Sequence, residues 1–167
     1  MPLTPTPTYK MQRGKEIQAA VEALEKRRGF RAYGVREGER RFGVWLHSER
    51  LGFGGKLDLL VVTPGACYPV DFKDTEGGVR HNHRVQIAAY ALLAEEAFQR
   101  PAPEGFVFIV PRKSVVSVPV AEPDRQAVLA AVAEIRWMIG HEDLPAPTPV
   151  RARCVVCEYR NYCADIW

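Results

Sequence analysis

Apolar positions alternate between helical and strand spacings along this chain. Ile17, Val21 and Leu24 are four and three residues apart, which predicts a helix over 10–28 that ends at Gly29. The apolar pattern also predicts a helix that Asn82 caps and that continues towards Phe98, and another over 122–139 with its apolar side formed by Val128, Ala131, Val132, Ile135 and Ile139. The expected strands are 30–35, 42–48, 53–62, 68–73, 105–110 and 114–120.

The order of these elements predicts one α/β domain. The Thr63-Pro64-Gly65 turn joins two of the strands into a hairpin, and 74–83 is expected to be a polar loop. We expect an extended entry at 1–8, a single folded domain at 9–143, and a Pro-rich linker with a cysteine tail at 144–167.

Charge and hydropathy exclude some classes of protein. The 167 residues carry a formal net charge of +3, which permits a polyanionic partner without identifying one. No apolar run approaches the ~20 residues of a membrane span, and no secretory leader is recognisable, so we expect a cytoplasmic protein without a membrane partner.

Three of the four cysteines lie close together near the C-terminus. The tail contains Cys154, Cys157 and Cys163, whereas Cys67 lies in the predicted hairpin. Because disulfides belong mainly to oxidising compartments, this spacing favours a metal or cluster site over two cross-links.

The predicted hairpin carries the most informative chemistry. Asp58 lies within the first strand, and Asp71 and Lys73 end the second, where residues two apart leave the same face. Two carboxylates that converge there can bind Mg²⁺ or Mn²⁺, and a nearby lysine can hold the attacking water or a phosphoryl oxygen. An exposed ion pair is the ordinary alternative for Asp-x-Lys, but Asp58 lies in the apolar run Leu57 to Val62, where burial requires a partner or a metal.

Four segments, in this order, resemble the RecB-like branch of the PD-(D/E)XK nucleases. They are GKLDLL, YPVDFK, QIAAY and CVVCEYRNYC, and TYKMQRGKEIQ is similar to the family's first motif. More narrowly, the chain resembles the CRISPR-associated exonucleases of the Cas-four family over about 8–163.

The resemblance implies a restriction-endonuclease-like core, in which a central mixed sheet is flanked by helices. It implies that Asp58, Asp71 and the Phe72 carbonyl are metal ligands and that Lys73 is the catalytic lysine. Gln86 and Tyr90, which share a helix face, would orient the site and the DNA. The implied activity is metal-dependent cleavage of single-stranded DNA ends, often 5′ to 3′, during prespacer trimming with the CRISPR integrase complex.

Two positions depart from the family pattern. Gln18 stands where the family's first motif carries a metal-binding histidine, and Glu22, one turn later, is an alternative ligand or a solvated charge. The family's [4Fe–4S] cluster uses one N-terminal and three C-terminal cysteines, and no cysteine precedes the first motif here. We therefore expect a labile or absent cluster, or a zinc site, and we expect Cys67 to be a small buried thiol.

Two further functions compete with the exonuclease. The Gln18 departure and the absent cysteine favour a weakly active or inactive DNA-binding scaffold subunit of the same complex, whereas the retained Asp58, Asp71 and Lys73 oppose it. A RecB-like nuclease of DNA repair is the other alternative. The neighbouring His81 and His83 are able to contact metal or phosphate, although a solvated loop is the ordinary expectation.

Overall fold

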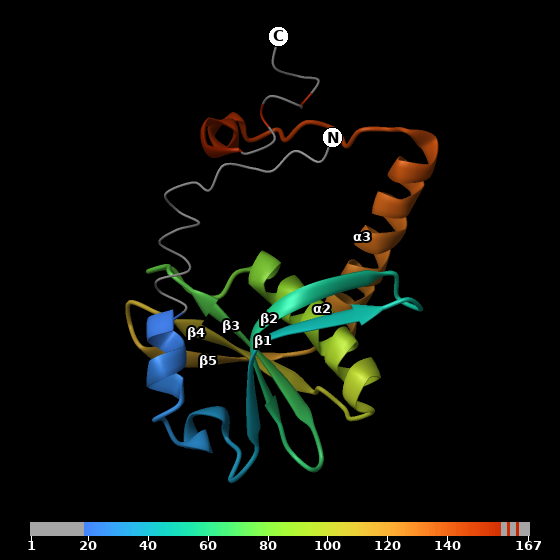
Figure 1. Ribbon diagram of the computed structural model, residues 1–167. Coiled ribbons are helices and arrows are strands. Elements are labelled where there is room, and N and C mark those ends of the chain that lie inside the picture. The colour runs from blue at the N-terminus through green and yellow to red at the C-terminus, as the bar shows by residue number, and fades with distance from the viewer. Residues whose placement is uncertain (1–18, 158–159, 161–162, 164–167) are drawn as a thin grey trace. The chain divides into compact units, whose positions relative to one another are not determined.

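A computed structural model of the chain describes residues 19–157, 160 and 163. The chain divides into two compact units, 1–132 and 133–167. The elements of the first unit follow a short helical segment at 19–25 and are η1 (Phe30–Tyr33), β1 (Glu39–Ser48), β2 (Phe53–Val62), β3 (Cys67–Lys73), α2 (His81–Phe98), β4 (Glu104–Ile109) and β5 (Ser114–Pro119). Helix α3 (Glu122–His141) begins in the first unit and ends in the second, which also holds η2 (Arg151–Val156) (Figure 1).

A five-stranded mixed sheet in the order β1-β2-β3-β4-β5 forms the centre of the first unit. The β1–β2, β2–β3 and β4–β5 pairs are antiparallel, and β3 pairs in parallel with β4. The predicted hairpin is confirmed, because β2 and β3 flank the Thr63-Pro64-Gly65 turn. The parallel pair needs a crossover connection, which α2 supplies.

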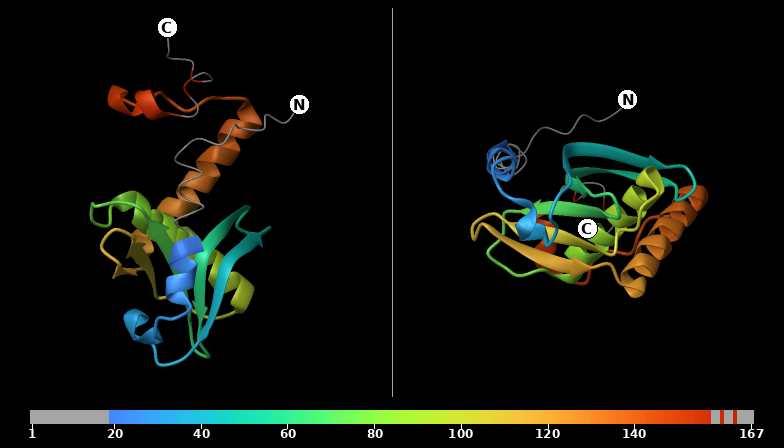
Figure 2. Two further views of the ribbon diagram at one scale, coloured as in Figure 1. Left: turned by 60° about the vertical axis from the view of Figure 1, so that its left-hand side comes forward. Right: turned by 90° about the horizontal axis from the view of Figure 1, so that it is seen from below.

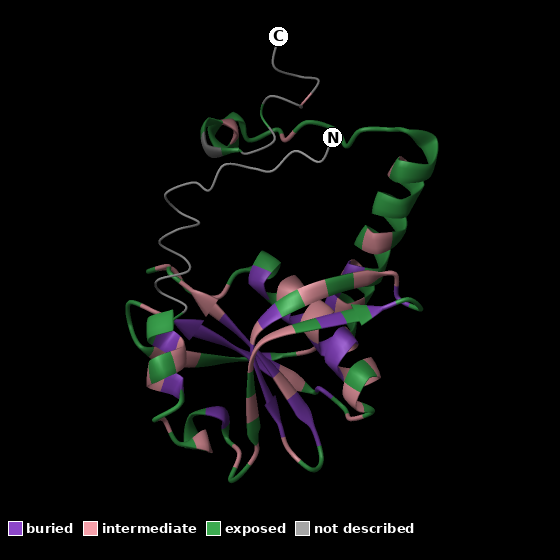
Figure 3. Ribbon diagram, viewed as in Figure 1, coloured by how far each residue is buried: buried purple, intermediate pink, exposed green. Residues whose placement is uncertain are grey.

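Helices cover both faces of this sheet (Figure 2). Leu59, Val61 and Phe108 pack with Val21 of the 19–25 segment on one face. On the other face, Ile87 of α2 packs against β4 and β5, and further α2 side chains pack against β2. The predicted α/β fold class, a central mixed sheet with flanking helices, is therefore confirmed. The central strands are the most buried part of the chain, whereas α3 is largely exposed (Figure 3).

The strand expected at 30–35 is wrong. Phe30–Tyr33 form a 3₁₀ helix that follows Gly29 and ends at Gly34, whose φ of 66° terminates the turn. The buried Tyr33 side chain donates a hydrogen bond of 2.5 Å to Glu25. The Tyr33 side chain is thus held by Glu25, and residues 30–33 form no β-ladder.

Several predicted boundaries also change. β1 begins at Glu39 rather than at residue 42, and the described part of the first helix ends at residue 25. The loop expected over 74–83 ends at Arg80, which occupies the N-cap position predicted for Asn82. The backbone N–H of Arg80 donates to Nδ1 of His83, so His83 is a buried helical residue and not part of a solvated loop.

Among the described residues, the apolar side predicted for the helix over 122–139 is buried near the beginning of the helix and exposed near its end. Val128 is buried, but Ile135 and Ile139 are 51% and 73% exposed. The first turns of α3 are held to α2 by ion pairs that join Asp124 to Arg84 and Arg125 to Glu95. Helical spacing predicts that Val128, Ile135 and Ile139 share one side of the helix, but it does not predict which of them is buried.

Candidate active site

The alternation of β2 side chains between the two faces of the sheet is interrupted at Asp58. Gly55 and Leu57 face α2, whereas Leu59 faces the side of the 19–25 segment. The register with β1 is continuous except where Asp58 would pair with Gly43, and Gly43 has a φ of 58° that favours glycine. This local break lies at the acidic residue of the apolar run Leu57 to Val62.

Asp58 also marks the point where β2 and β3 stop pairing. The ladder ends at the Leu59–Val70 pair, and beyond it the Asp58 carboxylate accepts the Phe72 N–H at 2.8 Å. The Lys73 carbonyl accepts the Val110 N–H beyond the end of β4, so the Phe72 carbonyl points to the opposite side of β3, the side of Asp58. Asp58 and the Phe72 carbonyl therefore lie at the same side of the strand.

Asp71 and Lys73 leave the same face of β3, as predicted. Their side chains form an ion pair of 2.7 Å between Nζ and Oδ2, and Asp71 is only 3% exposed. The Lys73 ammonium thus balances the charge of the buried Asp71 Oδ2. A carboxylate oxygen has more than one lone pair, so Oδ2 can also bind a metal ion.

Gln86 of α2 connects these groups. Its Oε1 accepts a hydrogen bond from Lys73 Nζ at 2.9 Å, and its Nε2 donates to Asp71 Oδ1 at 3.0 Å. The same Nε2 donates to the Tyr90 hydroxyl at 2.9 Å. One amide therefore links the Asp71 carboxylate, the Lys73 ammonium and the Tyr90 hydroxyl, and the Tyr90 ring lies beside Gly55 of β2.

The surroundings of Asp58 and Asp71 disfavour the charged form of each carboxyl group. Burial raises the pKa of Asp58 to about 6, despite the Phe72 hydrogen bond, and the charge of Asp71 adds to this shift. Burial also raises the pKa of Asp71, while Lys73 opposes that change. Burial raises the pKa of Tyr90 as well, against the hydrogen bond from Gln86. Two partly desolvated carboxylates with raised pKa values are a donor set that a divalent cation would stabilise.

The donor chemistry fits Mg²⁺ or Mn²⁺. The group consists of hard oxygen atoms, and one of them, Asp71 Oδ2, is on a buried side chain and already faces the Lys73 ammonium. In the part of the chain that the structure describes, no three His, Cys, Asp or Glu side chains form a metal-binding group, so Glu22 does not join the two aspartates. Gln18, the predicted additional ligand, lies outside the described residues.

The cysteines are not cross-linked. Cys67 is a buried free thiol at the end of the hairpin, as predicted, and burial raises its pKa. Cys154, Cys157 and Cys163 are also free, and among the described residues they belong to no metal-binding group. Their role as cluster or zinc ligands therefore stays a prediction.

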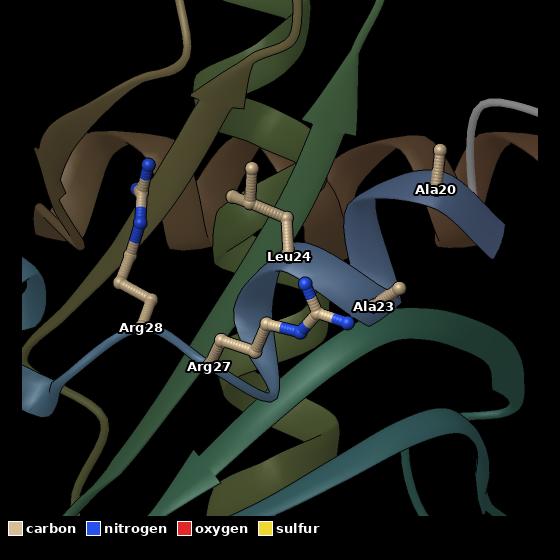
Figure 4. Close-up of a pocket in the computed structure, with 5 residues that line it drawn as sticks. All are labelled: Ala20, Ala23, Leu24, Arg27 and Arg28. Atoms are coloured by element: carbon tan, nitrogen blue, oxygen red, sulfur yellow. The ribbon is translucent and has the colours of Figure 1, made fainter.

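A hollow of about 550 Å³ has a lining that does not include Asp58, Asp71 or Lys73 (Figure 4). Its lining comes from the 19–25 segment and the turn after it, and consists of Ala20, Ala23, Leu24, Arg27 and Arg28. Leu24 belongs to the core on the face of the sheet opposite α2. Among the described residues that line it there is no carboxylate, so this lining does not favour a hard cation.

The sequence pattern missed two features of this site. Gly43 has a detectable signal, since an isolated glycine in a strand indicates a bulge or a close approach. The burial of His83 has no signal in the sequence, because it depends on the residue at which α2 begins.

Comparison with known proteins identifies the family. A model of the PD-(D/E)XK nuclease superfamily matches residues 6–164, so the chain belongs to this superfamily. The solved structure of SSO0001 covers 92% of this chain and 69% of its own, with a TM-score of 0.54 and 15% identity, and it supports the fold alone.

Within this superfamily, the chain is similar to several proteins named Cas4. The chain is 29% identical over 152 residues to the CRISPR-associated exonuclease Cas4 of Francisella tularensis subsp. novicida (strain U112), covering 91% of this chain and 76% of that protein. Identity to Cas4 of Thermoproteus tenax is 25% over 163 residues, covering 96% and 80%. Identity to a Cas4/endonuclease Cas1 fusion of Rhodospirillum rubrum is 32% over 123 residues, covering 71% of this chain and 21% of the fusion.

No helix within the described residues is long and apolar enough to cross a membrane.

Proposed function

We propose that this protein is a metal-dependent exodeoxyribonuclease that trims single-stranded DNA ends in the spacer-acquisition step of a CRISPR system. The observation that carries the proposal is the bonded group of Asp71, Lys73, Gln86 and Tyr90 beside Asp58. Membership of the nuclease superfamily and similarity to proteins named Cas4 support it.

Asp58, Asp71 and the Phe72 carbonyl would hold Mg²⁺ or Mn²⁺. When bound, such an ion lowers the pKa of a coordinated water and neutralises charge on the phosphate. The fit rests on the hard oxygen donors and on the two carboxylates, whose pKa values burial raises.

Lys73 is the residue that would act on the substrate directly. Its Nζ lies against Asp71 Oδ2 and donates to Gln86 Oε1, which leaves a further N–H for a phosphate oxygen or the attacking water. In hydrolysis the water oxygen forms a bond to phosphorus and loses a proton, one ester P–O bond breaks, and the departing sugar oxygen gains a proton. Lys73 would thus stabilise the charge that grows on the phosphate.

Gln86 and Tyr90 would position the site. Gln86 holds both Asp71 and Lys73, so it fixes their separation. The Tyr90 hydroxyl accepts from Gln86 and keeps its own proton for the DNA strand.

The proposed partners follow from the relatives. Fusion of Cas4 with the endonuclease Cas1 in Rhodospirillum rubrum and Myxococcus xanthus supports association with a Cas1-type integrase. We also propose that 9–143 forms the nuclease domain and that the three cysteines of the 144–167 tail bind a [4Fe–4S] cluster or zinc.

A nuclease assay tests the function. End-labelled single-stranded DNA should be shortened in Mg²⁺ or Mn²⁺ and left intact in EDTA, and Asp71→Asn and Lys73→Ala should each abolish shortening. Lys26→Ala is a matched control, because it removes one positive charge from an exposed lysine that packs on Phe42 and not on the site. Binding of DNA without shortening would favour the scaffold alternative. Capture of a Cas1 endonuclease by the full chain separates the CRISPR role from DNA repair.

A further inference from the structure

His83 lies on the same side of α2 as the two motif residues. It precedes Gln86 by three residues and Tyr90 by seven, and residues at these spacings share a helix face. Because helical side chains lean towards the N-terminus, Gln86 extends over the turn that contains His83. The imidazole is nevertheless buried, with 9% of its residue surface exposed.

The hydrogen bonding of the ring defines its tautomer. The Arg80 N–H donates to Nδ1 at 3.2 Å, so the lone pair of Nδ1 is engaged and the ring proton is on Nε2. Within the described part of the chain, Nε2–H donates to no acceptor, and Nε2 is not one of the fully buried unpaired atoms. The ring therefore presents a fixed donor at an accessible point.

The surroundings of this donor suit an anion. Burial lowers the pKa of His83, and the charges of Lys73 and Arg80 lower it further. These causes favour the neutral ring, and two cationic side chains act on it, of which Lys73 is the proposed catalytic lysine. Two cations and one neutral N–H match a DNA phosphate, which offers only acceptor oxygens.

We propose that Nε2–H of His83 donates a hydrogen bond to a phosphate oxygen of the DNA strand beside the phosphate that Lys73 contacts. The inference rests on the proposed nuclease function. His83 is then a substrate-binding residue, and its cap bond to Arg80 holds the ring in the orientation that binding requires. The contact carries no base specificity, since it is made to the backbone of the strand.

Two substitutions test the roles of the two ring nitrogens separately. His83→Asn keeps an oxygen near the position of Nδ1, which can accept the Arg80 N–H, but it lacks the distal donor. His83→Gln keeps a distal N–H but lacks the near acceptor. The pair therefore separates a contact to DNA from a role in starting the helix.

Binding of fluorescein-labelled oligo(dT), measured by anisotropy in EDTA, provides a readout that is independent of cleavage. His83→Asn should weaken binding about tenfold, as expected for loss of one hydrogen bond to a charged group, and His83→Gln should bind within about twofold of the parent. Because the ring is neutral, the salt dependence of binding should be the same in all three proteins. In cleavage, His83→Asn should raise KM with little change in kcat.

The opposite order overturns the inference. If His83→Gln lowers Tm and weakens binding while His83→Asn matches the parent, the residue only caps α2. If both variants bind as the parent does, the distal N–H does not contact DNA. These results are distinct from failure of the proposed function, which is recorded separately as absence of metal-dependent shortening by the parent protein.

Discussion

Replacing Asp58 by Asn should stabilise the protein in the absence of metal. In EDTA the folded state must hold the Asp58 carboxylate in a partly buried place beside Asp71, and this raises its pKa to about 6 from 3.8. Asparagine retains an oxygen that can accept the Phe72 N–H, which Asp58 now accepts at 2.8 Å, but it carries no charge.

The magnitude follows from the pKa difference. Below pH 3.8 the carboxyl is protonated in the folded and unfolded states, so its charge has no effect on stability. As pH rises through this value the unfolded chain ionises first, and the free energy of unfolding falls until the folded carboxyl ionises near pH 6. A separation of about two pH units at about 1.4 kcal/mol per unit gives a loss of ~3 kcal/mol above pH 6. Asp58→Asn removes this loss.

Urea unfolding of both proteins in EDTA, from below pH 3.8 to above pH 6, measures the effect. The two free energies of unfolding should converge at the acid end, and the variant should be more stable by ~1–3 kcal/mol at the neutral end. Added Mn²⁺ should then stabilise the parent and have less effect on the variant. A difference that is independent of pH, or a variant that is less stable at neutral pH, would refute the electrostatic account of Asp58.

Three other predictions concern packing, metal preference and the tail. Gly105→Ala should destabilise the fold by ~2–3 kcal/mol in urea unfolding, because the new Cβ would lie 2.6 Å from Ile87 and 2.7 Å from the Pro69 carbonyl; Gly65→Ala, with nothing within 4 Å, is the control and should change little. Gln18→His should raise Mn²⁺-supported cleavage if position 18 is a ligand, since imidazole suits Mn²⁺ better than Mg²⁺; an unchanged rate and metal preference would place it outside the site. Iron and sulfide assays after anaerobic purification should find a substoichiometric cluster, and a full, air-stable four-iron cluster would contradict this.

Local sequence was sufficient to identify the main chemical groups. Asp71 and Lys73 are two apart on a strand, and Gln86 and Tyr90 are four apart on a helix, so each pair had to share a face wherever the element packed. The turn between the two strands likewise determined their antiparallel pairing.

Tertiary structure decided how these pairs meet. The amide of Gln86 reaches both Asp71 and Lys73 only because α2 packs across β3. The N-cap at Arg80 turned the expected loop residue His83 into a buried donor, and packing of Tyr33 against Glu25 replaced an expected strand by a 3₁₀ helix. The spacing of residues in the sequence predicts which side chains share a face of one helix or strand. The partner of that face depends on contacts between residues distant in the chain, which a local pattern does not contain.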